Sequence, residues 1–396
     1  MPERIAPVHV VAYTATSAVG SGRSAMLEAV DAQRSGLVAN DFGVDPLRTW
    51  VGRVAGLDQP LPSALRRWDC RNHRLAWSGL HADDFIAAVA AARARHGAGR
   101  VAVVVGTSTS SIGATEEAYR ALDGDGRFPV ERRGARLHTL HSLGMFVQEV
   151  LDLEGPCVTV STACSSSAKA FAAAERMLRL GLVDAAVVGG TDTLCGNVLF
   201  GFNALQLVSP EACRPFDPAR RGINLGEAAG YALLERGPGR LQLIGHGESS
   251  DAHHMSSPDP QGLGAERALD DALARAGIDA AAVDHVNLHG TASQKNDAVE
   301  AALVARRFPA RTHASSTKGY TGHTLGTAGI LEAAFSLLAL ETGRMPGTVN
   351  SLALDPVCGP QIRLQPARGQ VRIALSNSFG FGGTNCVLVF ARGEGS

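Results

Sequence analysis

The chain has 396 residues, of which 45% are hydrophobic, and its 37 basic side chains nearly balance 38 acidic ones. A formal net charge of −1 gives no support to a role in binding nucleic acid or a membrane surface. Seven scattered cysteines without Cys-x-x-Cys spacing indicate neither a disulfide framework nor a zinc site. The N-terminus has no signal-peptide pattern and no apolar run approaches the roughly 20 residues of a membrane span, so we expect a cytoplasmic protein.

The first half of the chain alternates strand and helix patterns. Residues 9–18 favour a strand, and residues 101–105 form a continuous apolar run that ends at Gly106. A short run of that kind is typical of a fully buried strand in a parallel sheet. Helices are expected over residues 24–31, 83–95, 116–122 and 140–151, with the polar segment 123–136 at the surface and a further buried strand over 184–190.

Residues 65–74, Leu-Arg-Arg-Trp-Asp-Cys-Arg-Asn-His-Arg, are both basic and aromatic. This composition is typical of a solvated helix face, or of a docking patch for an acidic partner. The sequence alone leaves both interpretations open.

A cysteine stands between a predicted strand and a predicted helix in the segment 156–171. Residues 158–160, Val-Thr-Val, belong to a short apolar run with β-branched residues, which favours a buried strand, whereas residues 168–180 are helix formers. Cys164 lies in the small-residue turn between them. Free backbone N–H groups and the helix dipole would favour a thiolate there, and the following serines could cap the helix. We interpret Cys164 as a nucleophile, with a buried structural cysteine as the alternative.

The rest of the chain repeats this order of strand, turn and helix. A loop-rich segment over residues 191–225 precedes two strands, 231–234 and 241–244, that we expect to pair. The later elements are helices over residues 266–276, 296–308 and 326–340 and strands over residues 285–289, 313–317, 373–377 and 386–390. Because both parts place reactive residues just after a strand, the sequence predicts a duplicated α/β unit with halves of 1–240 and 241–396.

Three further groups carry chemistry. His289 ends a predicted strand, and Lys318 and His323 lie five residues apart among small residues at a helix start. The loop 379–383, Phe-Gly-Phe-Gly-Gly, has glycines that permit unusual backbone angles, and its amides could bind an oxyanion. A single histidine after a strand is more often structural than catalytic. The functional interpretation therefore depends on all of these groups together.

In their order along the chain, these motifs resemble those of the elongating β-ketoacyl-acyl-carrier-protein synthases of the thiolase superfamily. The match covers the Cys164 segment, the three groups just described, and the stretches Arg214-Pro-Phe-Asp, Gly226-Glu-Ala-Ala-Gly and Ser249-Ser-Asp-Ala-His. It implies an α/β, thiolase-like fold, with two similar halves packed as layers of helices and mixed sheets. It also implies an acyltransferase that condenses a Cys-bound acyl chain with malonyl-acyl carrier protein (ACP), with loss of carbon dioxide. The substrates would be attached to the phosphopantetheine of ACP, and the enzyme itself would need neither a metal nor an organic cofactor.

The same resemblance implies a role for individual residues. Cys164 would accept the acyl chain, and His289 and His323 would complete a catalytic triad. Lys318 would organise the site electrostatically, paired with Glu332. The implied set also contains Phe381 as a moving gate whose amide joins that of Cys164 at the oxyanion, Phe379 at the substrate, and Thr291 and Ser293 at the phosphopantetheine arm. The family usually has Thr where this chain has Ser293.

The resemblance implies protein partners as well. Arg66 and Arg67 match a basic patch that meets the acidic carrier protein in this family, and Arg132 and Arg133 would extend it. A dimer is also implied, either a homodimer or a heterodimer with a chain-length-factor-like subunit.

Other members of the superfamily fit less well. A thiolase would need a second catalytic cysteine in a Cys-x-Gly context, which Cys386 lacks. An initiating synthase would use a Cys-His-Asn set, and a non-catalytic chain-length factor would lack Cys164. Residues 191–194, 247–253 and 318–326 are similar to accessory synthases of bacterial aryl-polyene pigment clusters, which extend aromatic starter units. The sequence supports fatty-acid biosynthesis equally well, so the pathway stays open.

Overall fold

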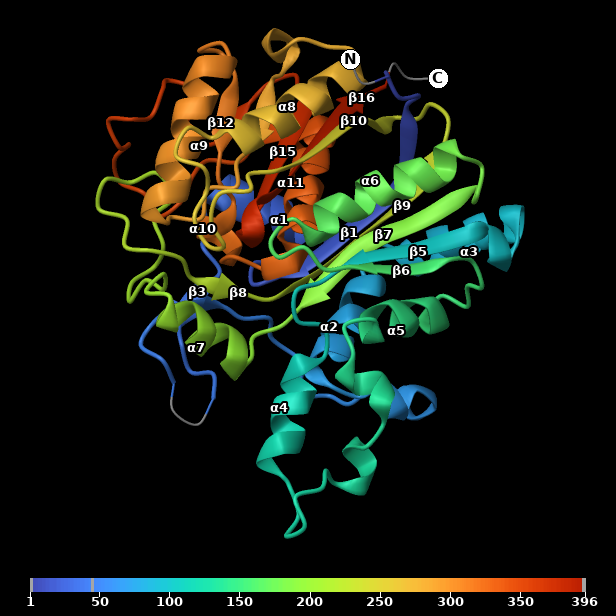
Figure 1. Cartoon of the computed structure of the whole chain (residues 1–396). Helices are drawn as coiled ribbons and strands as arrows, with labels where there is room; N and C mark the ends of the chain where they lie inside the picture. Colours follow the sequence, from blue (N-terminus) through green and yellow to red (C-terminus); the bar gives the residue numbers. More distant parts are fainter. Residues whose placement is uncertain (1–2, 44–45, 394–396) are drawn as a thin grey trace.

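The computed structural model describes residues 3–43 and 46–393, and two β-sheets form its framework (Figure 1). The first sheet has the strand order β2-β1-β9-β7-β5-β6 and the second β10-β16-β15-β11-β12. The strands of the first sheet are β1 (Val8–Ser17), β2 (Gly20–Ser21), β5 (Val101–Gly106), β6 (Cys157–Val160), β7 (Ala185–Asp192) and β9 (Ala228–Arg236). Those of the second are β10 (Leu241–Ser250), β11 (His285–Asn287), β12 (His313–Ser315), β15 (Ile373–Gly380) and β16 (Thr384–Arg392). The predicted boundary between the halves falls in the connection from β9 to β10.

Two small sheets complete the strands. One has the order β3-β4-β8 and the other joins β13 to β14. Their members are β3 (Leu37–Ala39), β4 (Trp50–Gly52), β8 (Leu225–Gly226), β13 (Arg344–Met345) and β14 (Ala367–Arg368).

The helices form layers on and between the two large sheets. They are α1 (Gly22–Ala32), α2 (Arg71–Leu80), α3 (Phe85–His96), α4 (Ile112–Arg120), α5 (Ser142–Val150), α6 (Ser166–Arg179), α7 (Gly196–Ala204), α8 (Leu263–Ala276), α9 (Gln294–Arg307), α10 (Lys318–Thr321) and α11 (Ala328–Thr342). Helices α6 and α11 contact each other and both sheets, so they form the central layer (Figure 1). Helices α2, α3 and α5 pack on the first sheet, and α8 packs on the second. The layered α/β architecture with mixed sheets is the one predicted.

Glycines bring the central helices close to their neighbours. β5 is buried along its whole length, as its continuous apolar run predicts. A Cβ atom at Gly106, where β5 ends, would lie 2.2 Å from the backbone nitrogen of Ser167 in α6. A Cβ at Gly329 in α11 would lie 2.5 Å from the backbone nitrogen of Ala168. Since no side chain fits these contacts, the start of α6 is held at a fixed position between β5 and α11.

The parallel strands determine where the reactive residues meet. β6, β5 and β7 are parallel neighbours in the first sheet, as are β15, β11 and β12 in the second. Parallel strands end at the same edge of a sheet, where ligands bind in open α/β folds. Cys164 follows β6, His289 follows β11, and Lys318 follows β12.

Two strand predictions were wrong. The strands predicted to pair over 231–234 and 241–244 belong to different sheets, because β9 pairs with β1 and β7 whereas β10 pairs with β16. A short connection favours a hairpin, but each strand is longer than predicted and finds its partner elsewhere in the chain. β6 was expected to be buried, yet all four of its residues are only half-buried, because β6 is the edge strand of its sheet.

The most apolar helical segment lies in the protein interior. Residues 325–342 have a mean hydropathy of 1.3 over 18 residues, which by length and composition alone would suffice to cross a membrane. The prediction that no run approaches a membrane span therefore needs this exception. Because 89% of the segment is buried and α11 packs between the two sheets, it is explained as a core helix.

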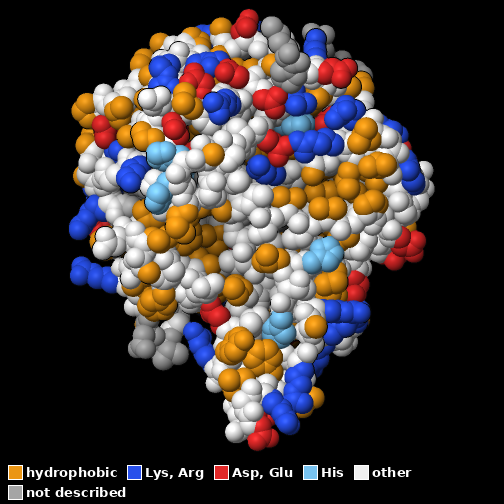
Figure 2. All heavy atoms as spheres, viewed as in Figure 1, with side chains coloured by type: hydrophobic (Ala, Val, Ile, Leu, Met, Phe, Trp, Pro, Cys, Tyr) orange, Lys and Arg blue, Asp and Glu red, His pale blue; other side chains and the backbone are white. Residues whose placement is uncertain are grey.

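One part of the first half projects from the body. Helix α4 and the connection to α5 extend beyond the sheets, and Figure 2 shows basic and hydrophobic side chains gathered on this projection. Tyr119, Leu122 and Val130 are exposed there. The polar segment 123–136 is at the surface, as predicted.

Candidate active site

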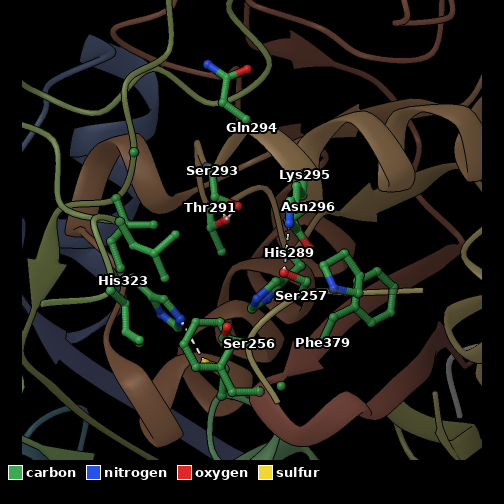
Figure 3. Close-up of a pocket in the computed structure, with 18 of the residues that line it drawn as sticks. Ser256, Ser257, His289, Thr291, Ser293, Gln294, Lys295, Asn296, His323 and Phe379 are labelled. Atoms are coloured by element: carbon green, nitrogen blue, oxygen red, sulfur yellow. Dashed lines mark hydrogen bonds between the residues drawn. The ribbon is translucent and has the colours of Figure 1, made fainter. Parts of the chain in front are cut away.

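A cavity of about 460 Å³ opens over the carboxyl ends of the parallel strands (Figure 3). Cys164, His289 and His323 line it, together with both phenylalanines of the glycine loop. The predicted Thr291 and Ser293 also line the cavity, whereas Lys318 and Glu332 lie behind its wall. The four predicted docking arginines lie outside it.

Cys164 lies in a tight turn between β6 and α6. It is only 4% exposed, and Ala163 before it has a φ of 53°, which is unusual for a residue with a side chain. The prediction that the serines cap the helix was wrong. Among the residues described, Ser165 and Ser166 instead donate their hydroxyls to the carbonyls of Thr162 and Ala163, and so brace the turn itself.

Cys164 and the two histidines converge on one point. The sulfur of Cys164 and a ring nitrogen of each histidine all lie within 4.8 Å of one another. His323 Nε2 is 3.0 Å from Cys164 Sγ, and the two imidazole rings are perpendicular with centroids 5.5 Å apart. Three such atoms could ligate a metal ion, but the nearby ammonium of Lys318 opposes a cation there.

Hydrogen bonds define which nitrogen of each ring carries the proton. The backbone N–H of Leu325 donates to His323 Nδ1 at 3.3 Å, and Lys318 Nζ donates to His289 Nδ1 at 3.3 Å. Burial lowers the pKa of both histidines well below the usual 6.5, and the charge of Lys318 lowers it further. Both rings are therefore neutral near pH 7, with their protons on Nε2. The site presents two N–H donors beside the thiol.

The thiol itself does not follow the sequence-based expectation of a stabilised thiolate. Burial raises the pKa of Cys164 to about 11, although the charge of Lys318 and the backbone N–H of Phe381 act in the opposite direction. Removal from water outweighs the helix terminus and the nearby amides. Cys164 therefore rests as a thiol. The nearby N–H donors stabilise the thiolate form, but not enough to offset the effect of burial.

The predicted pair of Lys318 and Glu332 is present and buried. Lys318 also donates to the carbonyl of His289, so one ammonium holds both the backbone and the ring of that histidine. Burial raises the pKa of Glu332 to about 7, and the charge of Lys318 opposes this rise. The ammonium of Lys318, held in place by Glu332, therefore lies directly behind the His289 ring.

The glycine loop covers the sulfur. Phe381 packs on Phe202 with ring centroids 5.5 Å apart, and Phe379 packs on His289 at 5.8 Å. Gly382 and Gly383 have φ values of 79° and 74°, a conformation that favours glycine. The loop turns sharply enough to point the N–H of Phe381 toward Cys164.

Polar side chains line much of the cavity wall (Figure 3). Thr291 Oγ1 donates to Ser293 Oγ at 3.0 Å. Lys295 Nζ donates to Ser257 Oγ at 3.2 Å, and both residues line the cavity. This wall offers hydroxyl and ammonium groups to a polar arm that enters the cavity.

Sequence reasoning missed two buried carboxylates that position the site. Glu300 accepts hydrogen bonds from the backbone N–H groups of His289 at 2.8 Å and Gly290 at 2.7 Å. Asp192 accepts from the backbone and side chains of the turns after β5 and before α11. An acid in the helix after the histidine motif was a weak signal for Glu300, but the burial that gives it this role is a tertiary property.

The four predicted docking arginines lie on the surface. Arg66 and Arg67 are exposed in a 3₁₀ turn, Ser63–Trp68, whereas Arg132 ends and Arg133 follows a second 3₁₀ turn, Val130–Arg132, in the connection from α4 to α5. Three of these arginines form ion pairs within the chain: Arg67 with Glu149, Arg132 with Glu117, and Arg133 with Asp123. Segment 65–74 is also more than a solvated face, because Trp68 is 1% exposed and its indole N–H donates to Glu149.

Comparisons with known proteins agree with this geometry. The family model "Beta-ketoacyl synthase, N-terminal domain" matches residues 77–238, and "Beta-ketoacyl synthase, C-terminal domain" matches residues 242–351. Nodulation protein E of Rhizobium meliloti (strain 1021) is 36% identical over 304 residues, covering 74% of this chain and 75% of that protein. The 3-oxoacyl-[acyl-carrier-protein] synthase 2 of the same organism is 41% identical over 266 residues, covering 61% of this chain and 62% of that protein.

Solved structures extend the likeness to nearly the whole chain. The ketosynthase ApeO in complex with its chain length factor ApeC, from Xenorhabdus doucetiae, matches with a TM-score of 0.89 and 34% identity over 98% of both chains. The ishigamide ketosynthase/chain length factor matches with a TM-score of 0.87 and 26% identity, over 98% of this chain and 100% of that chain. The predicted thiolase-like fold and condensing activity are therefore confirmed, and the chain belongs to the β-ketoacyl synthase family of acyl-transferring condensing enzymes.

Proposed function

We propose that Cys164 takes an acyl chain from a carrier protein and that the site then joins this chain to a malonyl unit. This proposal depends mainly on one observation, which is that two neutral imidazole N–H donors converge on the Cys164 sulfur. The distance from His323 Nε2 to that sulfur is 3.0 Å. Donors of this kind stabilise oxyanions, which both half-reactions generate.

In the first half-reaction, Cys164 sulfur attacks the thioester carbonyl of the acyl carrier. The carbon–sulfur bond to the carrier breaks, and the thiol proton moves to the departing phosphopantetheine sulfur. The backbone N–H groups of Cys164 and Phe381 both point toward the sulfur. They are placed to hold the oxyanion of the tetrahedral intermediate.

In the second half-reaction, malonyl carrier loses carbon dioxide and leaves an enolate. The Nε2–H groups of His289 and His323 would donate to its oxygen. The enolate carbon attacks the acyl-Cys164 carbonyl, the carbon–sulfur bond breaks, and a β-ketoacyl carrier leaves. The thiolate that remains takes a proton from water and returns to the thiol, which its pKa of about 11 favours.

The carrier protein would dock on the basic surface of the first half. Arg66, Arg67 and Arg133 are exposed, and Arg136 lies over the Trp68 ring at 5.8 Å, which joins the two basic segments. An acidic carrier is the partner that such a surface fits.

A dimer is part of the proposal. β6 is an edge strand of only four half-buried residues, and an open edge offers backbone groups to a second strand. The same edge in a second copy, or in a chain-length-factor-like subunit, would pair with it.

For the pathway, we propose elongation in fatty-acid biosynthesis in the cytoplasm. The second candidate is an accessory ketosynthase of an aryl-polyene or polyketide pigment pathway. It is favoured by the match over 98% of both chains to a ketosynthase solved with its chain length factor. A purely non-catalytic subunit is disfavoured, because Cys164 and both histidines are in place.

Replacing the nucleophile tests the proposal. Cys164→Ala should abolish both acyl-enzyme formation and condensation, measured by intact-protein mass spectrometry and by release of β-ketoacyl carrier. Cys358→Ala is the matched control, since Cys358 is half-buried and lies outside the cavity. Condensation at the wild-type rate by Cys164→Ala would rule out the mechanism.

A further inference from the structure

Lysine is scarce in this chain, and one of its lysines lines the cavity that holds Cys164. Of the 37 basic residues only three are lysines, at positions 169, 295 and 318. Lys169 pairs with Glu248, and Lys318 pairs with Glu332. Lys295 lines the cavity and forms no ion pair within the part of the chain that the structure describes. Its charge is therefore open to an anion that comes from outside the chain.

The cavity leads from buried reactive groups to an exposed entrance. Cys164 and the two histidines beside it are 4% exposed or less. Lys295 and His254 line the same cavity but are exposed. Residues that are both exposed and part of the lining mark the way in. Lys295 lies in the first turn of α9, two residues after Ser293 (Figure 3). An arm that carries a thioester to Cys164 would enter beside Lys295.

Hydroxyl groups beside Lys295 have protons to donate. Lys295 Nζ donates to Ser257 Oγ at 3.2 Å, which holds the ammonium against the cavity wall. Because Ser257 accepts this bond on its oxygen, its own O–H can donate to a ligand. Ser293 likewise accepts from Thr291 at 3.0 Å, and its side chain does not cap α9. An ammonium with hydroxyl donors around it is a suitable site for a phosphate group.

The other charged side chains at the entrance are already engaged. Among the described residues that line the cavity, Asp251 carries the one carboxylate. Its oxygens accept from the Asn385 side chain at 2.6 Å and from the Asp259 backbone N–H at 3.0 Å. Arg221 also lines the cavity, but it pairs with a glutamate at 3.1 Å. Of the lysine and arginine residues described at the entrance, Lys295 is therefore the one left for an anionic ligand.

We propose that Lys295 binds the phosphate of the phosphopantetheine arm while the thioester at the other end of the arm reaches Cys164. The inference rests on the proposed function and adds a residue that binds its substrate. The arm carries its phosphate at the end remote from the sulfur, so the phosphate lies at the entrance when the thioester is at the buried thiol. There the ammonium supplies the opposite charge, and Ser257 supplies a hydroxyl donor.

The contact acts on binding and not on the chemical step. The phosphate takes no part in the reaction at Cys164, so its interaction with Lys295 is equally strong in the bound substrate and in the transition state. An interaction of this kind lowers the substrate concentration needed for half-saturation and leaves the maximal rate unchanged.

Two thioesters that differ only in the phosphate test the proposal without the carrier protein. They are octanoyl-pantetheine and its methyl phosphodiester, which carries the single negative charge of the carrier-bound arm. Acyl-Cys164 is quantified by intact-protein mass spectrometry over a range of substrate concentrations. For wild type we expect the phosphodiester to half-saturate at a concentration about tenfold lower, with the same maximal rate. Lys295→Met should bring this ratio close to one, and Lys295→Arg should retain most of it.

Two controls separate this contact from weaker effects of charge. Arg372→Met also removes one exposed positive charge, but Arg372 lies outside the cavity, so it should keep the wild-type ratio. Octanoyl-carrier protein is measured in parallel, because an acidic side chain of the carrier is a second source of negative charge at the entrance. Added salt should reduce the ratio of wild type and leave that of Lys295→Met unchanged.

Each outcome decides the matter. Equal half-saturation of wild type by the two thioesters would overturn this inference and leave the proposed function standing, because Cys164 is still acylated. A ratio that persists in Lys295→Met, or that Arg372→Met loses equally, would also overturn it. So would a Lys295→Met protein impaired only with octanoyl-carrier, since the lysine would then meet the carrier protein. Failure of either thioester to acylate Cys164 would refute the condensing role and this inference with it.

Discussion

Replacing His323 by alanine should separate the two half-reactions. Its Nε2–H points at Cys164 sulfur, and the bond from Leu325 to Nδ1 keeps the proton on that side of the ring. In the proposed mechanism, decarboxylation places negative charge on an enolate oxygen that this N–H would stabilise, whereas acyl transfer would rely on the backbone amides of Cys164 and Phe381. Removal of one such donor costs about a hundredfold to a thousandfold in rate. We expect decarboxylation to fall by that factor and acylation of Cys164 to fall much less.

The assay measures both half-reactions on the same preparation. Decarboxylation is followed as acetyl carrier formed from malonyl carrier without an acyl donor, and acylation as the mass of acyl-Cys164 in quenched samples. His81→Ala, at an exposed position outside the cavity, is the control, and His323→Gln retains an N–H donor and should recover part of the rate. Decarboxylation by His323→Ala at the wild-type rate would refute the donor role. Equal losses in both half-reactions would indicate damage to the fold instead.

Three further predictions concern positioning, packing and pH. Glu300→Gln removes a carboxylate that binds the His289 backbone N–H, so condensation should fall about tenfold to a hundredfold in a steady-state assay while acylation changes little; an unchanged condensation rate would contradict the positioning role. Gly106→Val forces a side chain against the α6 backbone 2.2 Å away and should lower the free energy of unfolding by about 3 kcal/mol or more. Gly99→Val, where no atom lies within 4 Å, should be tolerated in the same thermal melts. Burial lowers the pKa of His73 to about 4, so below pH 6.5 the unfolded chain binds a proton that the folded chain does not. The free energy of unfolding should therefore decrease as the pH falls from 6.5 toward 4, and denaturant titrations that show constant stability would refute this.

Local pattern predicted the elements that carry the site. The strand before Cys164, the strand before His289 and the helix after Lys318 all form where short runs of apolar and small residues indicate them. These residues meet because parallel strands end at one edge of each sheet, and that consequence follows from the order of strand, turn and helix alone. The glycine loop between β15 and β16 was equally clear from its composition.

What the sequence could not predict depends on neighbours distant in the chain. The separation of β9 and β10 into two sheets is set by their partners β1 and β16. In the sequence, Glu300 is indistinguishable from an ordinary helix residue. Its burial in the fold makes it a hydrogen-bond acceptor for backbone N–H groups. The protonation state of Cys164 likewise depends on how far the fold removes the thiol from water, which raises its pKa. The strand-to-helix turn, considered alone, predicts a lowered pKa.

Burial shifts the pKa of the thiol and the pKa of the histidines in opposite directions, and in the proposed mechanism these shifts would protect the enolate intermediate. It raises the pKa of Cys164 and lowers the pKa of His289 and His323, so the resting site has neither a thiolate nor an imidazolium. An imidazolium beside the enolate would be acidic enough to protonate its carbon, which would yield an acetyl carrier in place of a carbon–carbon bond. A neutral imidazole still donates its N–H but holds the proton far more tightly. The charge of Lys318 lowers the pKa of both histidines further, and in the proposed mechanism the same cation would also attract the negative charge that develops on the enolate.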